Sequence, residues 1–234
     1  MQLFYNSDIK QGATTFFFDK EESKHIVKVL RKKESDKIFI TNGLGFLFES
    51  EIILASEKKC EVKITKETFQ EPDKFYTHIA VAPTKMNDRL EWFLEKATEI
   101  GIHEITPIIC DHSERKVYKI DRAEKIIQAA MKQSLHYYIP KINEPISFSQ
   151  FVKSNSDGQK FIAHCEETDK KSFKNEVNKD KKVTILIGPE GDFSIKEINL
   201  AIENEFIPVT LGNTRLRTET AALVACHTIA LINE

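Results

Sequence analysis

The chain has 234 residues, of which 41% are hydrophobic, so it can bury a substantial core in one or two domains. Lysine and arginine total 34 against 36 aspartates and glutamates, which leaves a net charge of −2. This balance excludes a global positive field that would attract nucleic acid, so any RNA-binding surface must be a local patch.

The cysteines and the apolar segments exclude further classes. The four cysteines have no CxxC or Cys/His spacing, which predicts neither a zinc site nor a disulfide framework. No apolar run approaches the ~20 residues needed to span a bilayer, and the first residues lack the basic and apolar regions of a secretion signal. We therefore expect a soluble, cytoplasmic protein with no metal and no membrane partner.

Residues 1–70 are rich in short β-branched and aromatic segments. The predicted strands are Thr14–Phe18, Lys37–Thr41, Phe46–Leu54 and Cys60–Thr65. Asn42-Gly43 is a hairpin turn signal between two of them, and Glu21–Arg31 has the apolar spacing of a helix. This pattern predicts a small β-barrel with a basic helix.

A polar stretch, Lys66–Lys74, predicts a linker, and the pattern then changes to alternating strands and helices. The predicted strands are His78–Ala82, Glu104–Cys110, Lys160–Cys165, Val183–Gly188 and Ile207–Leu211, and the helices are Asp88–Ile100, Asp121–Ser134, Ser194–Glu203 and Thr218–Ile232, with a further short helix near Phe173. Such alternation over residues 75–234 predicts an α/β domain with a mostly parallel sheet.

The predicted helices carry signals at their ends and on their faces. Ser194 with Glu197 is a capping box, and Thr218 is a predicted N-cap. The last helix is apolar nearly all round, so it is expected to be buried inside a domain or between subunits, with His227 in a core. Trp92 is expected in a core or an interface.

Two predicted strands end at glycines and lead toward helices: one at Gly188-Pro-Glu-Gly191, the other at Leu211-Gly212. Glycine lets backbone groups approach a ligand, and the N-terminus of a following helix favours negative charge. The chain has neither a GxGxxG nor a GxxxxGK[ST] motif, so conventional dinucleotide and P-loop sites lose support. Taken alone, the first turn is more typical of a tight loop; the second segment, with Arg215, Arg217 and Glu219, favours a ligand site.

Several segments, in one order along nearly the whole chain, carry a family resemblance. They are Glu22–Arg31, Arg89–Gly101, Ser113–Arg115, Gln133-Ser134, Ile187–Ser194, Leu211-Gly212 and Leu216–Ala221. Together they resemble the bacterial 16S ribosomal RNA uracil-N3 methyltransferases of the SPOUT superfamily. The resemblance implies a PUA-like RNA-binding barrel at residues 1–70 and, at residues 75–234, a SPOUT methyltransferase domain with a trefoil knot that binds S-adenosylmethionine (SAM).

The resemblance also implies a substrate and roles for particular residues, while the apolar last helix predicts a homodimer. The substrate would be 16S ribosomal RNA or the small ribosomal subunit. The implied cofactor-binding residues are His164, Ile187, Gly188, Pro189, Glu190, Gly191, Leu211, Gly212, Leu216 and Arg217. The implied RNA-binding residues are Lys24, Lys28, Arg31, Lys32 and Lys33, which would otherwise be a solvated helix face.

Methyl transfer to the imide nitrogen N3 needs alignment with the breaking C–S bond and loss of the N3 proton. Arg217 or Arg115 could stabilise negative charge on the flanking carbonyl oxygens, and Glu114 or Glu219 could accept the proton. The alternative is that neither carboxylate is catalytic: Glu219 would be a charge at the start of a helix and Glu114 a surface residue.

The chain departs from the family pattern at several positions. Asp192 stands where a second glycine is usual, Thr214-Arg215 where an arginine and an apolar residue are usual, and His136-Tyr137 where Gly-Arg is common. Two other functions stay open: a SPOUT methyltransferase acting on another RNA base or a ribose, and an RNA-binding homologue with impaired catalysis.

Overall fold

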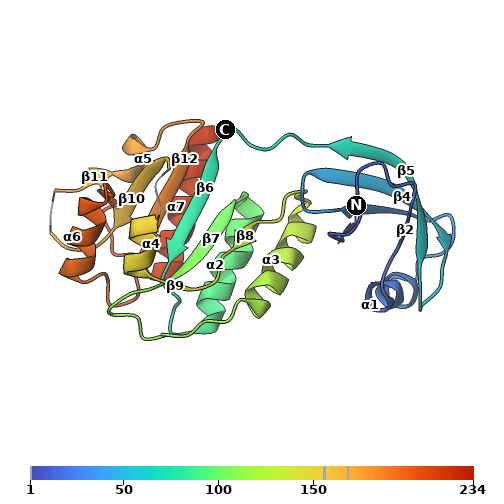
Figure 1. Cartoon of the computed structure of the whole chain (residues 1–234), viewed down its shortest axis with the longest axis horizontal. Coiled ribbons are helices and arrows are strands. Elements are labelled where there is room, and N and C mark those ends of the chain that lie inside the picture. Colours follow the sequence, from blue (N-terminus) through green and yellow to red (C-terminus); the bar gives the residue numbers. More distant parts are fainter. Residues whose placement is uncertain (1, 155–156, 168) are drawn as a thin grey trace. The chain divides into compact units, whose positions relative to one another are not determined.

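The fold is taken from a computed structural model, which describes residues 2–154, 157–167 and 169–234. The chain divides into two compact units (Figure 1). The first comprises residues 1–72 together with 131–139, and the second comprises residues 73–130 and 140–234. The first unit is therefore built from two separate stretches of sequence.

The first unit is a five-stranded sheet with a short helical segment. Its elements are β1 (Leu3–Tyr5), β2 (Thr15–Phe17), α1 (Lys20–Lys24), η1 (His25–Val29), β3 (Lys37–Thr41), β4 (Phe46–Leu54) and β5 (Glu61–Phe69). The sheet order is β1-β3-β4-β5-β2, antiparallel except for the β1–β3 pair. Alternating residues of these strands and Ile26 of η1 enclose its core.

Three details of this unit differ from the sequence prediction. Strand β1 has too few residues to be recognised and is formed by pairing with β3. Strand β5 runs into the stretch predicted as a linker, because Phe69 pairs with Phe46 and their rings lie 4.7 Å apart. The predicted helix changes to π-helical geometry at His25 and ends early, because Arg31 adopts a left-handed conformation at φ 55°.

The hairpin between β3 and β4 confirms the predicted turn. The Asn42 side chain accepts a hydrogen bond from Leu44 N (2.9 Å), and Gly43 and Gly45 both have positive φ. A Cβ atom at Gly45 would overlap the Tyr138 side chain, which approaches from the second stretch of this unit. Glycine at 45 therefore makes room for residues 131–139.

The second unit is an eight-stranded parallel sheet with helices on both faces. Its strands are β6 (Tyr76–Val81), β7 (Glu104–Ile109), β8 (Lys141–Ile142), β9 (Ile146–Ser147), β10 (Gln159–Ala163), β11 (Lys171–Ser172), β12 (Lys182–Ile187) and β13 (Ile207–Thr210). Its helices are α2 (Asn87–Ile100), α4 (Phe148–Ser154), α5 (Phe173–Glu176), α6 (Ile195–Glu203) and α7 (Thr218–Asn233), while α3 (Asp121–Ser134) runs from this unit into the first.

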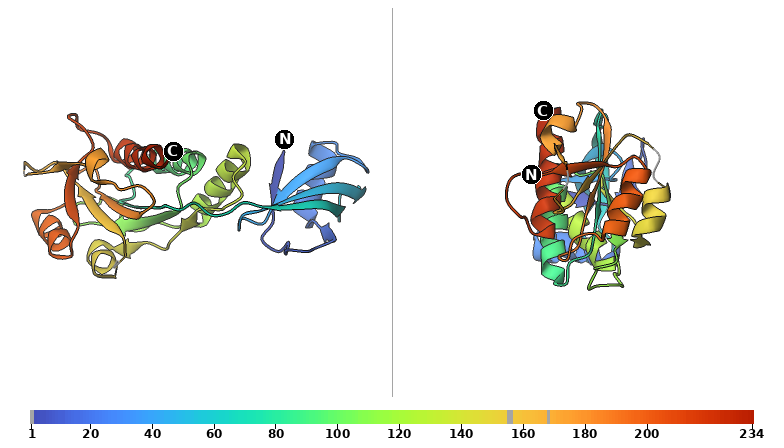
Figure 2. Two further views of the ribbon diagram at one scale, coloured as in Figure 1. Left: turned by 90° about the horizontal axis from the view of Figure 1, so that it is seen from above. Right: turned by 90° about the vertical axis from the view of Figure 1, so that its left-hand side faces the viewer.

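The sheet order is β11-β13-β10-β12-β6-β7-β8, with β9 beside β7. Helices α2 and α7 pack together on one face, and α4 and α6 pack on the other, as Figure 2 shows. An apolar cluster that includes Phe148, Leu186 and Phe206 fills the space under α4 and α6. The predicted α/β class with a parallel sheet is confirmed, whereas the trefoil knot stays a prediction.

The caps of two helices and the exposure of two side chains in this unit can be compared with the sequence predictions. The capping box at Ser194 is present, with the Ser194 hydroxyl and the Glu197 carboxylate each accepting from the other residue's backbone. The expected N-cap at Thr218 is wrong: α7 is preceded by Arg217, and the Thr218 side chain is used elsewhere. His227 is exposed and Trp92 is 44% exposed, so neither lies in the core of the described chain.

Candidate functional site

The site lies where three neighbouring strands end. Strands β10, β12 and β13 are parallel and adjacent, so their carboxyl ends meet at one edge of the sheet. The loops that follow these strands contain the glycine-bearing segments singled out from the sequence. Their convergence follows directly from the strand order.

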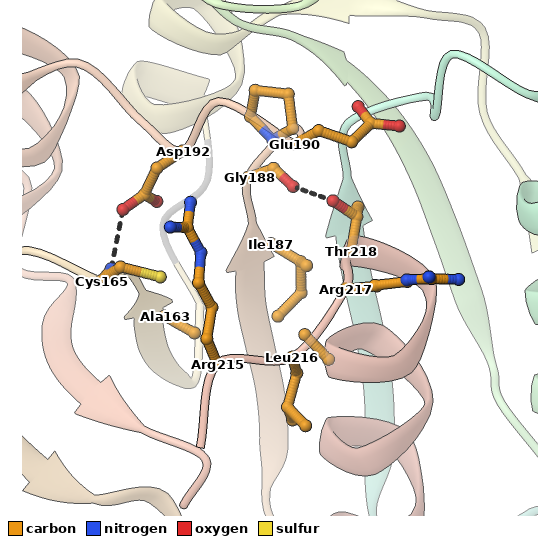
Figure 3. A pocket seen from close by; sticks show the side chains of 12 residues that line it. Ala163, Cys165, Ile187, Gly188, Glu190, Asp192, Arg215, Leu216, Arg217 and Thr218 are labelled. Carbon is orange, nitrogen blue, oxygen red and sulfur yellow. Dashed lines mark hydrogen bonds between the residues drawn. The ribbon is translucent and has the colours of Figure 1, made fainter. Parts of the chain in front are cut away.

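A cavity of about 350 Å³ opens between these loops, and a smaller hollow of about 90 Å³ adjoins it (Figure 3). The larger cavity is lined by Ala163, Cys165, Ile187, Gly188, Pro189, Glu190, Asp192, Arg215, Leu216, Arg217, Thr218 and Ala221. The smaller hollow shares Ala163, Cys165, Arg215, Leu216 and Ala221 with it and adds His164, Val209, Thr210, Leu211, Gly212 and Thr214.

The structure brings together nearly all of the residues predicted to hold a cofactor. Ile187, Gly188, Pro189, Glu190, Leu216 and Arg217 line the larger cavity, while His164, Leu211 and Gly212 line the smaller hollow. Gly191 is the exception. A Cβ atom there would lie 3.1 Å from the His112 Cβ, so the close approach at this glycine is to His112 rather than to the cavity.

Two glycines shape the walls for a physical reason. A Cβ atom on Gly188 would come within 3.1 Å of the Phe193 ring, which is buried in the apolar cluster under α6. Gly212 has φ +147°, a conformation that other residues rarely adopt. Both positions therefore expose backbone where a side chain would disturb the fold.

Thr218, at the start of α7, fixes the loop that contains Gly188. Its hydroxyl donates a hydrogen bond of 3.0 Å to the Gly188 carbonyl, as the dashed line in Figure 3 shows. The bond ties the end of β12 to the first turn of α7. The sequence pattern predicts a helix-capping role for this hydroxyl, and its contact with the site was not predicted.

His164 presents a buried polar ring to the smaller hollow. The residue is only 7% exposed, and both ring nitrogens lack a hydrogen-bond partner in the described part of the chain. Burial lowers its pKa, with a further contribution from the positive charge of Lys170. A neutral imidazole offers one donor and one acceptor, which suits the edge of a heterocyclic base.

Two of the four predicted catalytic residues contact Lys85, in the loop that follows β6. Arg115 donates through Nη2 to the Lys85 carbonyl (2.9 Å), and Glu114 forms a 2.7 Å ion pair with the Lys85 ammonium. Lys85 N donates to the Glu190 carboxylate (3.0 Å), so Lys85 links Glu114 and Arg115 to the cavity wall. The hydrogen bond to Glu114 raises the Lys85 pKa. Lys85 was not predicted as a site residue, because its contact with Glu190 joins segments that lie far apart in the sequence.

Glu219, the third of these residues, is 7% exposed. Its Oε1 lies 3.8 Å from Arg89 Nε, while its Oε2 is buried and has no hydrogen-bond partner among the described residues. The fourth, Arg217, is exposed and lines the larger cavity. Figure 3 shows the Arg217 side chain directed away from Arg215, on the other side of the cavity.

The predicted RNA-binding residues all lie in the first unit. Lys24 is on α1, Lys28 is on η1, and Arg31, Lys32 and Lys33 follow. All are exposed except the half-buried Lys32, and none has an ion-pair partner in the part of the chain that the structure describes. They form a basic patch with its charges available to a ligand.

Two family descriptions match the chain. An RNA methyltransferase domain matches residues 71–230, and an RNA methyltransferase PUA domain matches residues 18–65. The first match covers more than half of the chain. The chain belongs to this RNA methyltransferase family. The family resemblance predicted from the sequence is thereby confirmed.

Curated members of the family align with the chain over most of its length. The ribosomal RNA small subunit methyltransferase E of Bacillus subtilis is 31% identical, with 100% of this chain and 98% of the relative covered. The protein of the same name from Buchnera aphidicola is 33% identical over 90% of this chain and 85% of the relative.

Solved structures of family members have the same fold. A Porphyromonas gingivalis protein described as a "probable rRNA-methyltransferase" is 38% identical, with a TM-score of 0.92 and coverage of 100% of this chain and 98% of that one. A Legionella pneumophila protein solved with the bound cofactor SAM is 28% identical, with a TM-score of 0.88 and coverage of 99% and 97%.

The described residues contain no group of three or more His, Cys, Asp or Glu side chains placed to hold a metal ion. Among the same residues, no helix is both long and apolar enough to cross a bilayer.

Proposed function

We propose that this protein transfers a methyl group from SAM to N3 of a uracil in the 16S ribosomal RNA of the small ribosomal subunit. The observation that carries the proposal is the cavity where β10, β12 and β13 end, with Gly188 directly after β12 and Gly212 after β13. It occurs in a chain that aligns end to end with a relative named for methylation of small-subunit ribosomal RNA. A family member of the same fold was solved with SAM bound.

The residues present fit this cofactor. The unpartnered ring nitrogens of His164 and the exposed backbone near Gly212 suit a flat purine in the smaller hollow. Ile187, Gly188 and Leu216 would hold the rest of the molecule in the larger cavity. When bound, SAM supplies an electrophilic methyl group on a sulfonium.

The chain's own residues must orient the uracil and manage its proton. Arg217, on the cavity wall, would donate to a uracil carbonyl oxygen on which negative charge develops. Arg115 is held through Lys85 beside Glu190 and is the second candidate for this task. Glu219 would accept the N3 proton: it follows the cavity-lining Thr218, and its Oε2 is buried without a hydrogen-bond partner among the described residues.

The basic patch of the first unit (Lys24, Lys28, Arg31, Lys32 and Lys33) would bind RNA phosphates. Its ammonium and guanidinium groups are free of internal ion pairs within the described chain, so binding phosphate breaks no existing salt bridge. The PUA-type match over residues 18–65 covers the same segment and supports this role.

The protein would work as a homodimer in the cytoplasm, where ribosomal RNA is modified. Helix α7 is apolar on nearly every side, yet Leu231 is 58% exposed. Burying such a surface against a second copy would remove apolar area from water. Light scattering of the purified protein gives the mass directly, and a monomer at micromolar concentration would remove the dimer from the proposal.

The decisive experiment examines ribosomal RNA from cells that lack this protein. Nucleosides from its small-subunit RNA should lack 3-methyluridine, and purified protein with SAM should restore it. Normal 3-methyluridine in those cells would disprove the substrate assignment. Loss of another methylated base or a methylated ribose would favour the related methyltransferase, and SAM-independent RNA binding alone would favour an impaired homologue.

A further inference from the structure

The cavity contains two oppositely charged side chains that the proposed methyl transfer does not use. Asp192 and Arg215 both line it, from the loops after β12 and β13 respectively.

The Asp192 carboxylate is held firmly in place. Its Oδ2 accepts a hydrogen bond of 2.7 Å from Cys165 N, and its Oδ1 accepts one of 2.9 Å from Phe193 N. The residue has φ 64°, a left-handed conformation that Asp tolerates better than most residues. Each oxygen keeps a further lone pair for a donor in the cavity.

Arg215 supplies the opposite charge. It is exposed, and the described chain gives its guanidinium no hydrogen bond or ion pair. Figure 3 shows the guanidinium reaching up the cavity toward the side where Asp192 and Cys165 lie. A fixed carboxylate and a free guanidinium thus face the same space, and neither is within salt-bridge distance of the other.

We infer that Asp192 and Arg215 recognise the amino-acid end of the cofactor, with Asp192 accepting from its α-ammonium and Arg215 donating to its α-carboxylate. This inference rests on the proposed function. The smaller hollow is lined by Val209, Leu211 and Gly212 and fits the base. The amino-acid end of SAM carries one positive and one negative group side by side, which matches this pair of side chains.

The competing role for the pair is structural, with the two charges only neutralising each other. Two ligands separate the roles. S-adenosylhomocysteine has the amino-acid end, whereas 5′-methylthioadenosine shares the nucleoside and the thioether but lacks that end. If the pair recognises the amino-acid end, substituting either residue weakens the binding of S-adenosylhomocysteine alone. If the pair only maintains the shape of the cavity, the substitution weakens the binding of both ligands.

The experiment is calorimetric titration of both ligands into the full-length protein and its variants. Arg215→Gln should weaken S-adenosylhomocysteine binding about tenfold or more, the usual contribution of a charge-assisted hydrogen bond, and leave methylthioadenosine binding unchanged. Asp192→Asn, which suits a left-handed conformation, should discriminate in the same direction. Arg215→Lys should recover part of the loss, and Lys196→Gln, an exposed charge on α6 outside the cavity lining, should have no effect.

Every result of this titration either supports or contradicts the inference. Equal losses for the two ligands, or an unchanged affinity for S-adenosylhomocysteine in Arg215→Gln, would overturn the inference while leaving the proposed function standing. If neither ligand binds the unaltered protein, the proposed function fails as well. Thermal unfolding of each variant without ligand checks that a lost affinity is not a lost fold.

Discussion

At the scale of single residues, the two candidate proton acceptors differ in what already holds them. Glu114 is exposed and paired with Lys85, whereas Glu219 is buried with one free oxygen among the described residues. We expect Glu219→Gln to lower kcat by about 10²-fold or more with little change in SAM affinity, because the base is lost and the shape is kept. Single-turnover methylation of the RNA measures this.

The matched control is Glu114→Gln, whose charge is screened by solvent. It should keep most of the rate. The opposite ranking of the two variants would transfer the role of base to Glu114.

A second residue-scale expectation concerns pH. Burial lowers the pKa of His78 to about 4, and its Nε2 lies 2.7 Å from the Thr106 hydroxyl. Burial alone would raise the pKa of Glu104, but hydrogen bonds and charge, first among them the Asn143 amide, lower it to about 2. Both groups bind more protons when unfolded, so both stabilise the fold at neutral pH.

The His78 contribution is fully present above pH 6.5 and is lost as the pH falls toward 4, a change of about 2–3 kcal/mol. The Glu104 contribution follows between about pH 4.5 and 2. Calorimetric unfolding of His78→Gln should show a flatter loss of stability between pH 6.5 and 4 than the parent. Parallel curves would refute the assignment.

At the scale of elements, the hydrogen bond from the Thr218 hydroxyl to the Gly188 carbonyl joins the start of α7 to the end of β12. Replacing Thr218 by the isosteric valine leaves the buried Gly188 carbonyl without its donor, which costs about 1–3 kcal/mol. We expect Thr218→Val to lower the unfolding temperature and to weaken SAM binding, since that carbonyl shapes the cavity wall. Thr218→Ser keeps the hydroxyl and should bind SAM normally; a serine variant as weak as valine would exclude the hydrogen bond as the cause.

How far the sequence predicts these elements depends on how local their causes are. Helix α3 and strands β3 and β4 have the predicted bounds, because periodicity and turn residues within each segment determine them. Strand β1 exists only through its partner β3, and the end of β5 only through Phe46. No local pattern encodes such pairings.

The functional site likewise contains residues that a local sequence pattern predicts and residues that only distant contacts bring into place. Gly188 and Gly212 could be placed in the cavity because a strand ending at glycine is visible in the sequence. Lys85 and Arg89 could not, since they meet Glu190 and Glu219 across more than a hundred residues of intervening chain. The family resemblance supplied the order of the loops but not these contacts.

At the scale of the whole molecule, the net charge of −2 makes RNA binding depend on the basic patch. Each phosphate contact contributes about 0.7–0.9 to the slope of log affinity against log salt. The double variant Lys28→Gln with Arg31→Asn should therefore flatten the slope by roughly 1.5; asparagine is chosen because Arg31 has φ 55°. Fluorescence titrations over a salt series measure the slope, with Lys37→Gln, an exposed lysine on β3, as the control. An unaltered slope in the double variant would remove the patch from the RNA interface.

The discontinuous first unit has a consequence for how the protein can be divided. Residues 131–139 contribute Tyr137, whose carbonyl accepts from Gly45 N (2.9 Å) and the Thr41 hydroxyl (3.1 Å), and Tyr138, whose hydroxyl donates to Gln70 O (2.7 Å). Cutting the chain after Pro72 would leave that docking segment on the larger fragment. Two fragments, residues 1–72 and 73–234, should therefore bind each other when they are produced separately and mixed. Native mass spectrometry would detect their complex.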